Sequence, residues 1–200
     1  MKPLTLILAF TPLIVFSLLS RFLPHGYIGV AGLAAAAIAL IAILVSRPVW
    51  PPKILNTCSL VLFAVVAVLG FTLGSNDDRW LATWGGAGVG LVLGLTIVAL
   101  LPLMPFTEQF ARETTPQAYW SSPTFKKINL VLSAGWGAAI FLIGASRVAA
   151  AAVNGHTTRR LPELLLGLAV PGVIVIYMLK FSKSYPDKAA HQPADVPAGH

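Results

Sequence analysis

Charged residues are scarce in this chain: they make up 10% of its 200 residues, against about 25% in an ordinary soluble domain. Hydrophobic residues make up 56%, and the mean hydropathy is +0.80. So little charge cannot cover the surface of a soluble globular domain, and the composition excludes that class of protein. A net charge of +7 would point to nucleic acid in a soluble protein. Here the charges fall at the ends of apolar blocks, which predicts anionic lipid headgroups as partners and no nucleic acid.

Cysteine is nearly absent as well, and this limits the chemistry open to the chain. The one cysteine, Cys58, cannot form an internal disulfide, and there is no thiol cluster to hold a metal. Because Cys58 lies inside an apolar block, we expect it to act as a small buried apolar side chain.

Groups for catalysis or cofactor binding are also missing from the sequence pattern. The central thirds of the apolar blocks hold no ionisable residue. No nucleophile with a base, phosphate-binding glycine loop or haem-type helix pair is recognisable. The histidines lack the spacing of a metal pair, since His25 and His156 fall in loops and His191 and His200 in the C-terminal segment. We therefore predict no catalytic residue, no cofactor and no metal.

What the chain does have is apolar sequence, in six long blocks separated by short polar or proline-rich breaks. An α-helix needs about 20 apolar residues to cross a hydrocarbon core about 30 Å thick, and the blocks have about that length. They cover residues 4–22, 27–45, 54–73, 81–104, 128–152 and 161–181. They predict an all-α polytopic membrane protein, with a six-helix transmembrane domain over residues 1–181 and a disordered cytoplasmic tail over residues 182–200.

Positive charge is distributed unevenly between the two sides of this predicted domain. One side receives nine basic residues: Lys2, Arg47, Lys53, Arg112, Lys126, Lys127, Lys180, Lys183 and Lys188. The other side receives five: Arg21, Arg79, Arg147, Arg159 and Arg160. The side richer in Lys and Arg usually faces the cytoplasm, so we predict that both termini are cytoplasmic. The first block is too long for a signal-peptide core and lacks a small-x-small cleavage site, which predicts an uncleaved first helix.

The longest break, residues 105–127, is predicted to be a cytoplasmic loop with a short amphipathic helix on the membrane surface. Phe106 and Phe110 are four residues apart, and Glu108 and Arg112 form an acid-then-base pair at the favourable i, i+4 spacing. Such a helix lies between the fourth and fifth spans with its aromatic side toward lipid or toward the bundle.

Six residues of this loop form a candidate interaction patch. They are Phe106, Glu108, Phe110, Arg112, Glu113 and Trp120. The alternative is an interfacial helix whose charges are merely solvated, since exposed ion pairs add little stability. At the end of the loop, Ser122 followed by Pro123 predicts an N-cap with proline at the first helical position. The fifth helix should therefore begin before its apolar core.

The residues in and after this loop resemble a family of uncharacterised bacterial inner-membrane proteins. The resemblance is carried by the run from Pro105 to Glu113 and by Pro116, Trp120, Pro123, Phe125, Asn129 and Trp136. These proteins are loosely grouped with the intracellular septation protein A-like family, and their order of spans is similar along nearly the whole chain. The resemblance implies a multi-helix protein of the bacterial inner membrane connected with the cell envelope. It brings no catalytic residues, because the family has none that are established.

Glycine is concentrated in the fourth block, where it predicts close helix packing. Gly86, Gly90 and Gly94 are spaced four apart and share one helix face. Such a face lets the backbones of two membrane helices approach closely. The fifth block offers a matching face at Ser133 and Gly137. We predict packing within one chain, with a homodimer seam as the alternative.

Two prolines fall near the middle of their blocks, Pro12 in the first and Pro171 in the last. Each is expected to free a backbone carbonyl and bend its helix. Broken helices mark midplane binding sites in transporters, usually at corresponding positions of two halves. The first and last blocks do not correspond under a three-plus-three repeat, so that support for a binding site is missing.

A few polar residues lie just inside the ends of the blocks. Arg147, near the outer end of the fifth block, is predicted to snorkel or to pair with Asp77 or Asp78. Asn56 and Asn129, at the inner ends of the third and fifth blocks, are predicted to form hydrogen bonds across the bundle.

Three classes of function remain open. The first is a non-catalytic scaffold or interaction protein of the envelope, with a membrane-protein partner or a second copy of the chain. The second is a transporter or channel for a small neutral or amphipathic solute, although the empty midplane argues against ion or proton coupling. The third, a membrane enzyme acting on lipid, would require Glu108, Glu113, His25 or His156 to work without a visible constellation.

Overall fold

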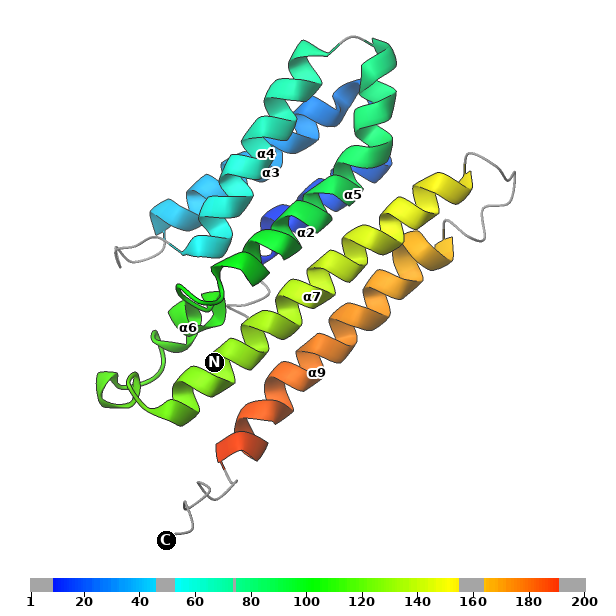
Figure 1. Cartoon of the computed structure of the whole chain (residues 1–200). Coiled ribbons are helices and arrows are strands. Elements are labelled where there is room, and N and C mark those ends of the chain that lie inside the picture. The colour runs from blue at the N-terminus through cyan, green and yellow to red at the C-terminus, as the bar shows by residue number, and fades with distance from the viewer. Residues whose placement is uncertain (1–8, 46–52, 74, 155–163, 191–200) are drawn as a thin grey trace, which may run out of the picture.

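The structure, a computed structural model, describes residues 9–45, 53–73, 75–154 and 164–190 of the chain. Over these residues it is all-helical and contains no strand, which confirms the predicted all-α class. Figure 1 shows the long helices running up and down beside one another in an elongated bundle.

The helices follow one another along the chain with short connections. They are α2 (Thr11–Phe22), η1 (His25–Tyr27), α3 (Ile28–Val45), α4 (Ile54–Thr72), α5 (Ser75–Leu100), α6 (Phe106–Ala111), η2 (Gln117–Tyr119), α7 (Pro123–Asn154), η3 (Leu165–Ala169) and α9 (Val170–Ala190). The start of α4, the end of α5, α6 and the start of α7 lie at one end of the bundle, which we call the α6 end (Figure 1).

Five helical segments are long and apolar enough to cross a membrane, as a membrane-embedded protein requires. They are Ile28–Val45, Ile54–Thr72, Thr83–Leu100, Pro123–Val153 and Leu165–Ala189. The sequence predicted six spans. The difference lies in the first block, where α2 is apolar but shorter and residues 4–8 fall outside the described residues.

Three helix boundaries bear on the predicted blocks. The fourth block was expected to begin at residue 81, but α5 already begins at Ser75. Ser, Asn and Asp are favoured in the first turn of a helix, which explains the earlier start. The helix ends at Leu100, so residues 101–104 form a turn rather than the end of a span. The start of α7 at Pro123 is confirmed, with the Ser122 hydroxyl accepting a hydrogen bond from the Phe125 amide at 3.2 Å.

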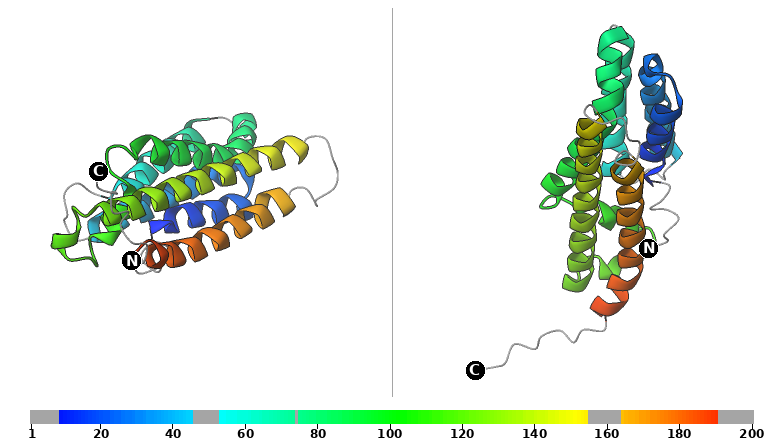
Figure 2. Two further views of the ribbon diagram at one scale, coloured as in Figure 1. Left: turned by 60° about the horizontal axis from the view of Figure 1, so that its bottom comes forward. Right: turned by 90° about the vertical axis from the view of Figure 1, so that its right-hand side faces the viewer.

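The last helix extends further than the sequence predicted. A disordered tail was expected from residue 182, whereas α9 continues to Ala190, and residues 191–200 fall outside the described residues. Two contacts explain the extension: the Trp136 indole of α7 donates a hydrogen bond to the Ser182 hydroxyl at 2.9 Å, and the Phe181 and Tyr185 rings stack. Even so, α9 lies at the edge of the bundle beside α7 (Figure 2), and Met178 is its one buried side chain among the described residues.

Glycines bring α5 and α7 into close contact. A Cβ placed on Gly90 would lie 2.9 Å from the Gly144 Cα, and one on Gly94 would lie 2.6 Å from the Phe141 amide nitrogen. Gly137 faces the Val98 side chain in the same way. The structure thus uses these glycines within one chain, where dispersion between closely spaced backbones replaces the hydrophobic effect that is missing in lipid.

A second glycine seam joins α3 to α4 and was not recognised in the sequence. A Cβ on Gly70 would meet the Gly29 backbone at 2.5 Å, and a Cβ on Gly32 would meet the Ala67 amide nitrogen at 2.8 Å. Gly29 and Gly32 lie three residues apart and so share a face of α3, which is the signal that identifies them.

Neither mid-block proline interrupts a regular α-helix among the described residues. Pro12 lies in the first turn of α2, where a missing amide hydrogen costs nothing because it would have no intrahelical partner. Pro171 lies in the first turn of α9, two residues after the π-helical turn η3 at Leu165–Ala169 ends. A proline removes the bond to the carbonyl four residues earlier, and a π-turn is one way a helix absorbs that loss.

Candidate interaction site at the α6 end

The short helix α6 is packed into the bundle. Phe106 and Phe110 are both only 2% exposed, and their rings meet edge-on with centroids 6.3 Å apart. Phe106 also meets Phe10 at 6.3 Å, and Phe10 lies against the Trp136 ring at 4.9 Å. The aromatic side of α6 therefore faces the protein core, which is one of the two orientations that the sequence left open.

Thr107 fixes α6 to α7 through a buried group of hydrogen bonds. Its amide donates to the Ser133 hydroxyl at 3.1 Å, and its hydroxyl donates to the Asn129 carbonyl at 2.9 Å. The two hydroxyl oxygens are 2.8 Å apart. Thr107 and Ser133 have no exposed surface, so each polar atom depends on these partners rather than on water.

We expect Thr107→Val to lower the free energy of unfolding by about 1–3 kcal/mol. The reason is that the buried Asn129 carbonyl and Ser133 hydroxyl lose the Thr107 hydroxyl as a hydrogen-bond partner. The shape of the side chain is almost unchanged. Thr114→Val is the matched control, since Thr114 is exposed and its hydroxyl makes only a local bond of 3.3 Å. Equilibrium unfolding in detergent micelles measures both variants, and an equal effect in the two would contradict the assigned role of Thr107.

Glu108 is a buried carboxylate with a specific partner. The residue is 6% exposed, and its Oε1 accepts hydrogen bonds from Arg112 Nε at 3.1 Å and from Arg112 Nη2. The Arg112 guanidinium lies 4.8 Å from the centre of the Trp120 ring, and the Trp120 indole donates to the Thr115 carbonyl at 2.9 Å. The predicted i, i+4 pair is therefore present and holds the segment after α6 in place.

The start of α4 is tied to α6 and to the segment that follows it by three contacts. The Lys53 ammonium pairs with the Glu113 carboxylate at 2.7 Å and lies 4.5 Å above the centre of the Phe110 ring. The side-chain oxygen of Gln109 accepts a hydrogen bond from the Ile54 amide at 2.8 Å. That amide is one of the donors that a helix start leaves without an intrahelical partner, so α6 caps α4.

The six residues of the predicted patch therefore divide into two groups. Phe106, Glu108 and Phe110 are buried and anchor α6, so a partner cannot touch them directly. Glu113 is exposed, and Arg112 and Trp120 are half-buried. Residues 112–122, which we call the platform, form the surface that remains, and Tyr119 is 60% exposed within it.

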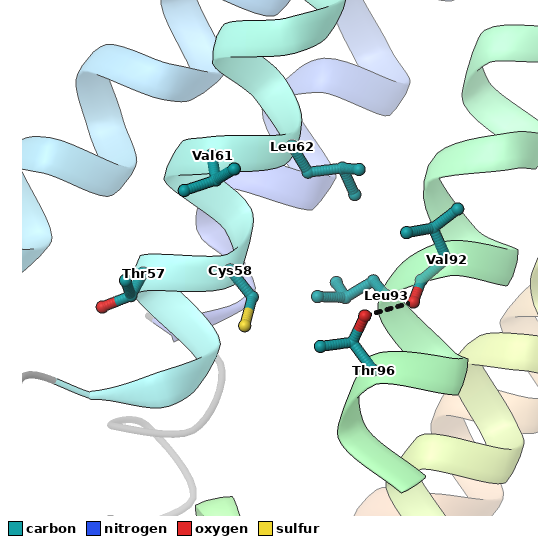
Figure 3. Close-up of a pocket in the computed structure, with 7 residues that line it drawn as sticks. All are labelled: Thr57, Cys58, Val61, Leu62, Val92, Leu93 and Thr96. Atoms are coloured by element: carbon teal, nitrogen blue, oxygen red, sulfur yellow. Dashed lines mark hydrogen bonds between the residues drawn. The ribbon is translucent and has the colours of Figure 1, made fainter. Parts of the chain in front are cut away.

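A lateral cleft separates α4 from α5 just above the α6 end (Figure 3). Its volume is about 250 Å³, and the residues that line it are Thr57, Cys58, Val61, Leu62, Val92, Leu93 and Thr96. The single cysteine, which we expected to be a small buried side chain, is half-buried at the wall of this cleft. No sequence pattern pointed to this cleft, because it depends on how two neighbouring helices diverge.

The structure also describes the surroundings of three polar residues near the ends of the predicted blocks. Arg147 donates to the Ser17 hydroxyl at 3.1 Å, whereas the side chains of its predicted partners, Asp77 and Asp78, lie outside the described residues. The Asn129 side chain donates to the Phe125 carbonyl of its own helix rather than across the bundle. Asn56 is 2% exposed, and its side-chain oxygen has no hydrogen-bond partner among the described residues.

A search of the described residues finds no cluster of three or more His, Cys, Asp or Glu side chains that would hold a metal ion. The side chains of the four histidines are outside the described residues. Comparison of the chain with known protein families, with curated proteins and with solved structures finds no match. The resemblance to septation protein A-like proteins stays a prediction.

Proposed function

We propose that this protein is a non-catalytic interaction protein of the bacterial inner membrane, which presents the platform to a partner protein of the cell envelope. One observation carries the proposal: the connection between α5 and α7 is folded and anchored. Within this connection Thr107 and Glu108 are buried, and Gln109 and Glu113 bond to Ile54 and Lys53 at the start of α4. A preorganised surface of this kind binds a partner without paying a large ordering entropy.

The proposed topology has six spans and places the α6 end in the cytoplasm. The described residues at that end include the basic side chains of Lys53, Arg112, Lys126 and Lys127. This excess of positive charge is typical of the cytoplasmic side and also attracts anionic lipid headgroups. In this arrangement α2, with the residues that precede it, supplies the first span and α6 lies at the membrane surface.

The proposal predicts that Tyr119→Ala releases the partner protein. Tyr119 is the most exposed aromatic residue of the platform, and exposed aromatic side chains dominate the energetics of many protein interfaces. The measurement is a mild-detergent pull-down of the tagged protein from native membranes, with bound proteins quantified relative to the bait. We expect a stoichiometric partner with the wild type and loss of that partner with Tyr119→Ala.

Tyr177→Ala is the control for this experiment. Tyr177 is 65% exposed but lies on α9, away from the platform, so its removal should leave the partner bound. Recovery of the same unaccompanied protein from wild type and both variants would contradict the proposed function.

The alternative function is a transporter for a small neutral or amphipathic solute. It is supported by the cleft between α4 and α5 and by the π-helical turn before Pro171, because interrupted helices line the binding sites of many transporters. Solute flux into vesicles that contain the purified protein alone would favour this function over the scaffold.

A further inference from the structure

We propose that the cleft between α4 and α5 holds one acyl chain of a phospholipid, with the phospholipid headgroup on the Lys53–Glu113 ion pair. The phospholipid comes from the membrane leaflet at the α6 end. The headgroup site shares Glu113 with the platform, but the proposal does not depend on the protein partner.

The chemistry of the cleft favours hydrocarbon. Its two hydroxyl groups are turned onto their own helices. Thr57 donates to the Lys53 carbonyl at 3.2 Å. Thr96 donates to the Val92 carbonyl at 2.8 Å, as Figure 3 shows. The other lining residues are aliphatic, apart from Cys58. A polar solute would lose its hydrogen bonds to water here and gain few in return, whereas an alkyl chain loses nothing.

The size of the cleft favours a single acyl chain over a second transmembrane helix as its occupant. An apolar cavity of about 150 Å³ holds a benzene molecule, so by proportion 250 Å³ takes about ten carbon atoms. The lining on α4 runs only from Thr57 to Leu62, which is about 9 Å at 1.5 Å per residue. A second transmembrane helix packs along a much longer seam, so part of an acyl chain is the better match.

The two ends of the cleft define where the headgroup lies. At one end α4 and α5 are joined by a short connection between Thr72 and Ser75. At the other end lies the Lys53–Glu113 ion pair, and Lys53 is one helical turn before Thr57 on α4.

The ion pair offers both signs of charge to the headgroup. The side chain of Glu113 is 39% exposed and that of Lys53 19% exposed. A phosphoethanolamine headgroup complements this pair, because its phosphate meets Lys53 while its amine meets Glu113. The pair and the cleft together therefore fit phosphatidylethanolamine.

The test counts phospholipids that stay bound to the full-length protein. The protein is reconstituted into vesicles of phosphatidylethanolamine and phosphatidylglycerol in equal parts, extracted in mild detergent and analysed by native mass spectrometry. We expect one retained phospholipid per protein chain, and we expect it to be predominantly phosphatidylethanolamine.

The variant Val61→Trp fills the cleft with an indole and should lower the retained fraction about tenfold, the ratio that about 1.4 kcal/mol of lost binding free energy produces. Val68→Trp is the matched control, since Val68 lies on the same helix, is 61% exposed against 60% for Val61, and does not line the cleft. Tryptophan fluorescence and thermal unfolding check that both variants fold.

Three results would overturn the proposal. The first is a wild-type protein whose mass includes no lipid, and the second is equal lipid retention by Val61→Trp and Val68→Trp. The third is a wild-type mass of two protein chains that falls to one protein chain in Val61→Trp. The last would assign the cleft to a second copy of the protein. Glu113→Gln tests the headgroup assignment, because loss of the carboxylate should remove the preference for phosphatidylethanolamine over phosphatidylglycerol. An unchanged preference would overturn that part.

Discussion

Gly94→Ala is expected to lower the free energy of unfolding by about 3 kcal/mol, the upper part of the usual range for overpacking. The added methyl group would lie 2.6 Å from the Phe141 amide nitrogen and 2.8 Å from the Phe141 Cα. These are backbone atoms of α7, which cannot rotate away as the tip of a flexible side chain does. The substitution therefore forces α5 and α7 apart along a seam that also includes Gly90 and Gly144.

Gly88→Ala is the control for this prediction, because it makes the same chemical change on the same helix. A Cβ on Gly88 meets nothing within 4 Å. Alanine has a higher helix propensity than glycine by about 1 kcal/mol, so this variant should be unchanged or more stable. Unfolding by sodium dodecyl sulfate in mixed micelles, followed by tryptophan fluorescence, measures both variants. Similar stability of the two would show that α5 and α7 do not pack closely at Gly94.

Glu108→Ala is expected to lower the free energy of unfolding by about 2 kcal/mol, the size of a hydrogen bond to a charged group. The Glu108 side chain is 8% exposed, and its carboxylate accepts two hydrogen bonds from Arg112. Without the carboxylate, the half-buried guanidinium keeps its positive charge and loses its anionic partner. We expect the segment after α6 to loosen as a result.

Glu113→Ala provides the comparison. It removes the carboxylate that pairs with Lys53 in the segment after α6. The Glu113 side chain is 39% exposed, and exposed ion pairs contribute about 1 kcal/mol or less. Limited proteolysis of residues 112–122 and equilibrium unfolding distinguish the two variants. A larger loss of stability in Glu113→Ala than in Glu108→Ala would contradict the burial of Glu108.

Much of the architecture follows from local sequence. Apolar runs of membrane-spanning length predict the helices, and Ser122 with Pro123 predicts the start of α7, because both signals act within one helix. The spacing of Gly90 and Gly94 similarly predicts a small-residue face. The boundaries of α5 and α9 were less accurate, since polar residues also continue a helix when its first turn or its tertiary contacts favour them.

The platform and the cleft depend on distances between helices that are remote in sequence. Glu108 and Glu113 look alike in the sequence, and only the packing of α6 against α4 and α7 makes the first a buried anchor and the second an exposed charge. The cleft exists because α5 packs closely on α7 through glycines and leaves its other side apart from α4.

The sequence by itself determined that this protein is built from long apolar helices and that glycines allow two of them to pack closely, because helix formation and face spacing are local properties. Only the tertiary structure decided which face of α6 is buried and where the bundle leaves an apolar opening. The physical reason is that burial depends on the surrounding helices, and no single segment contains that information.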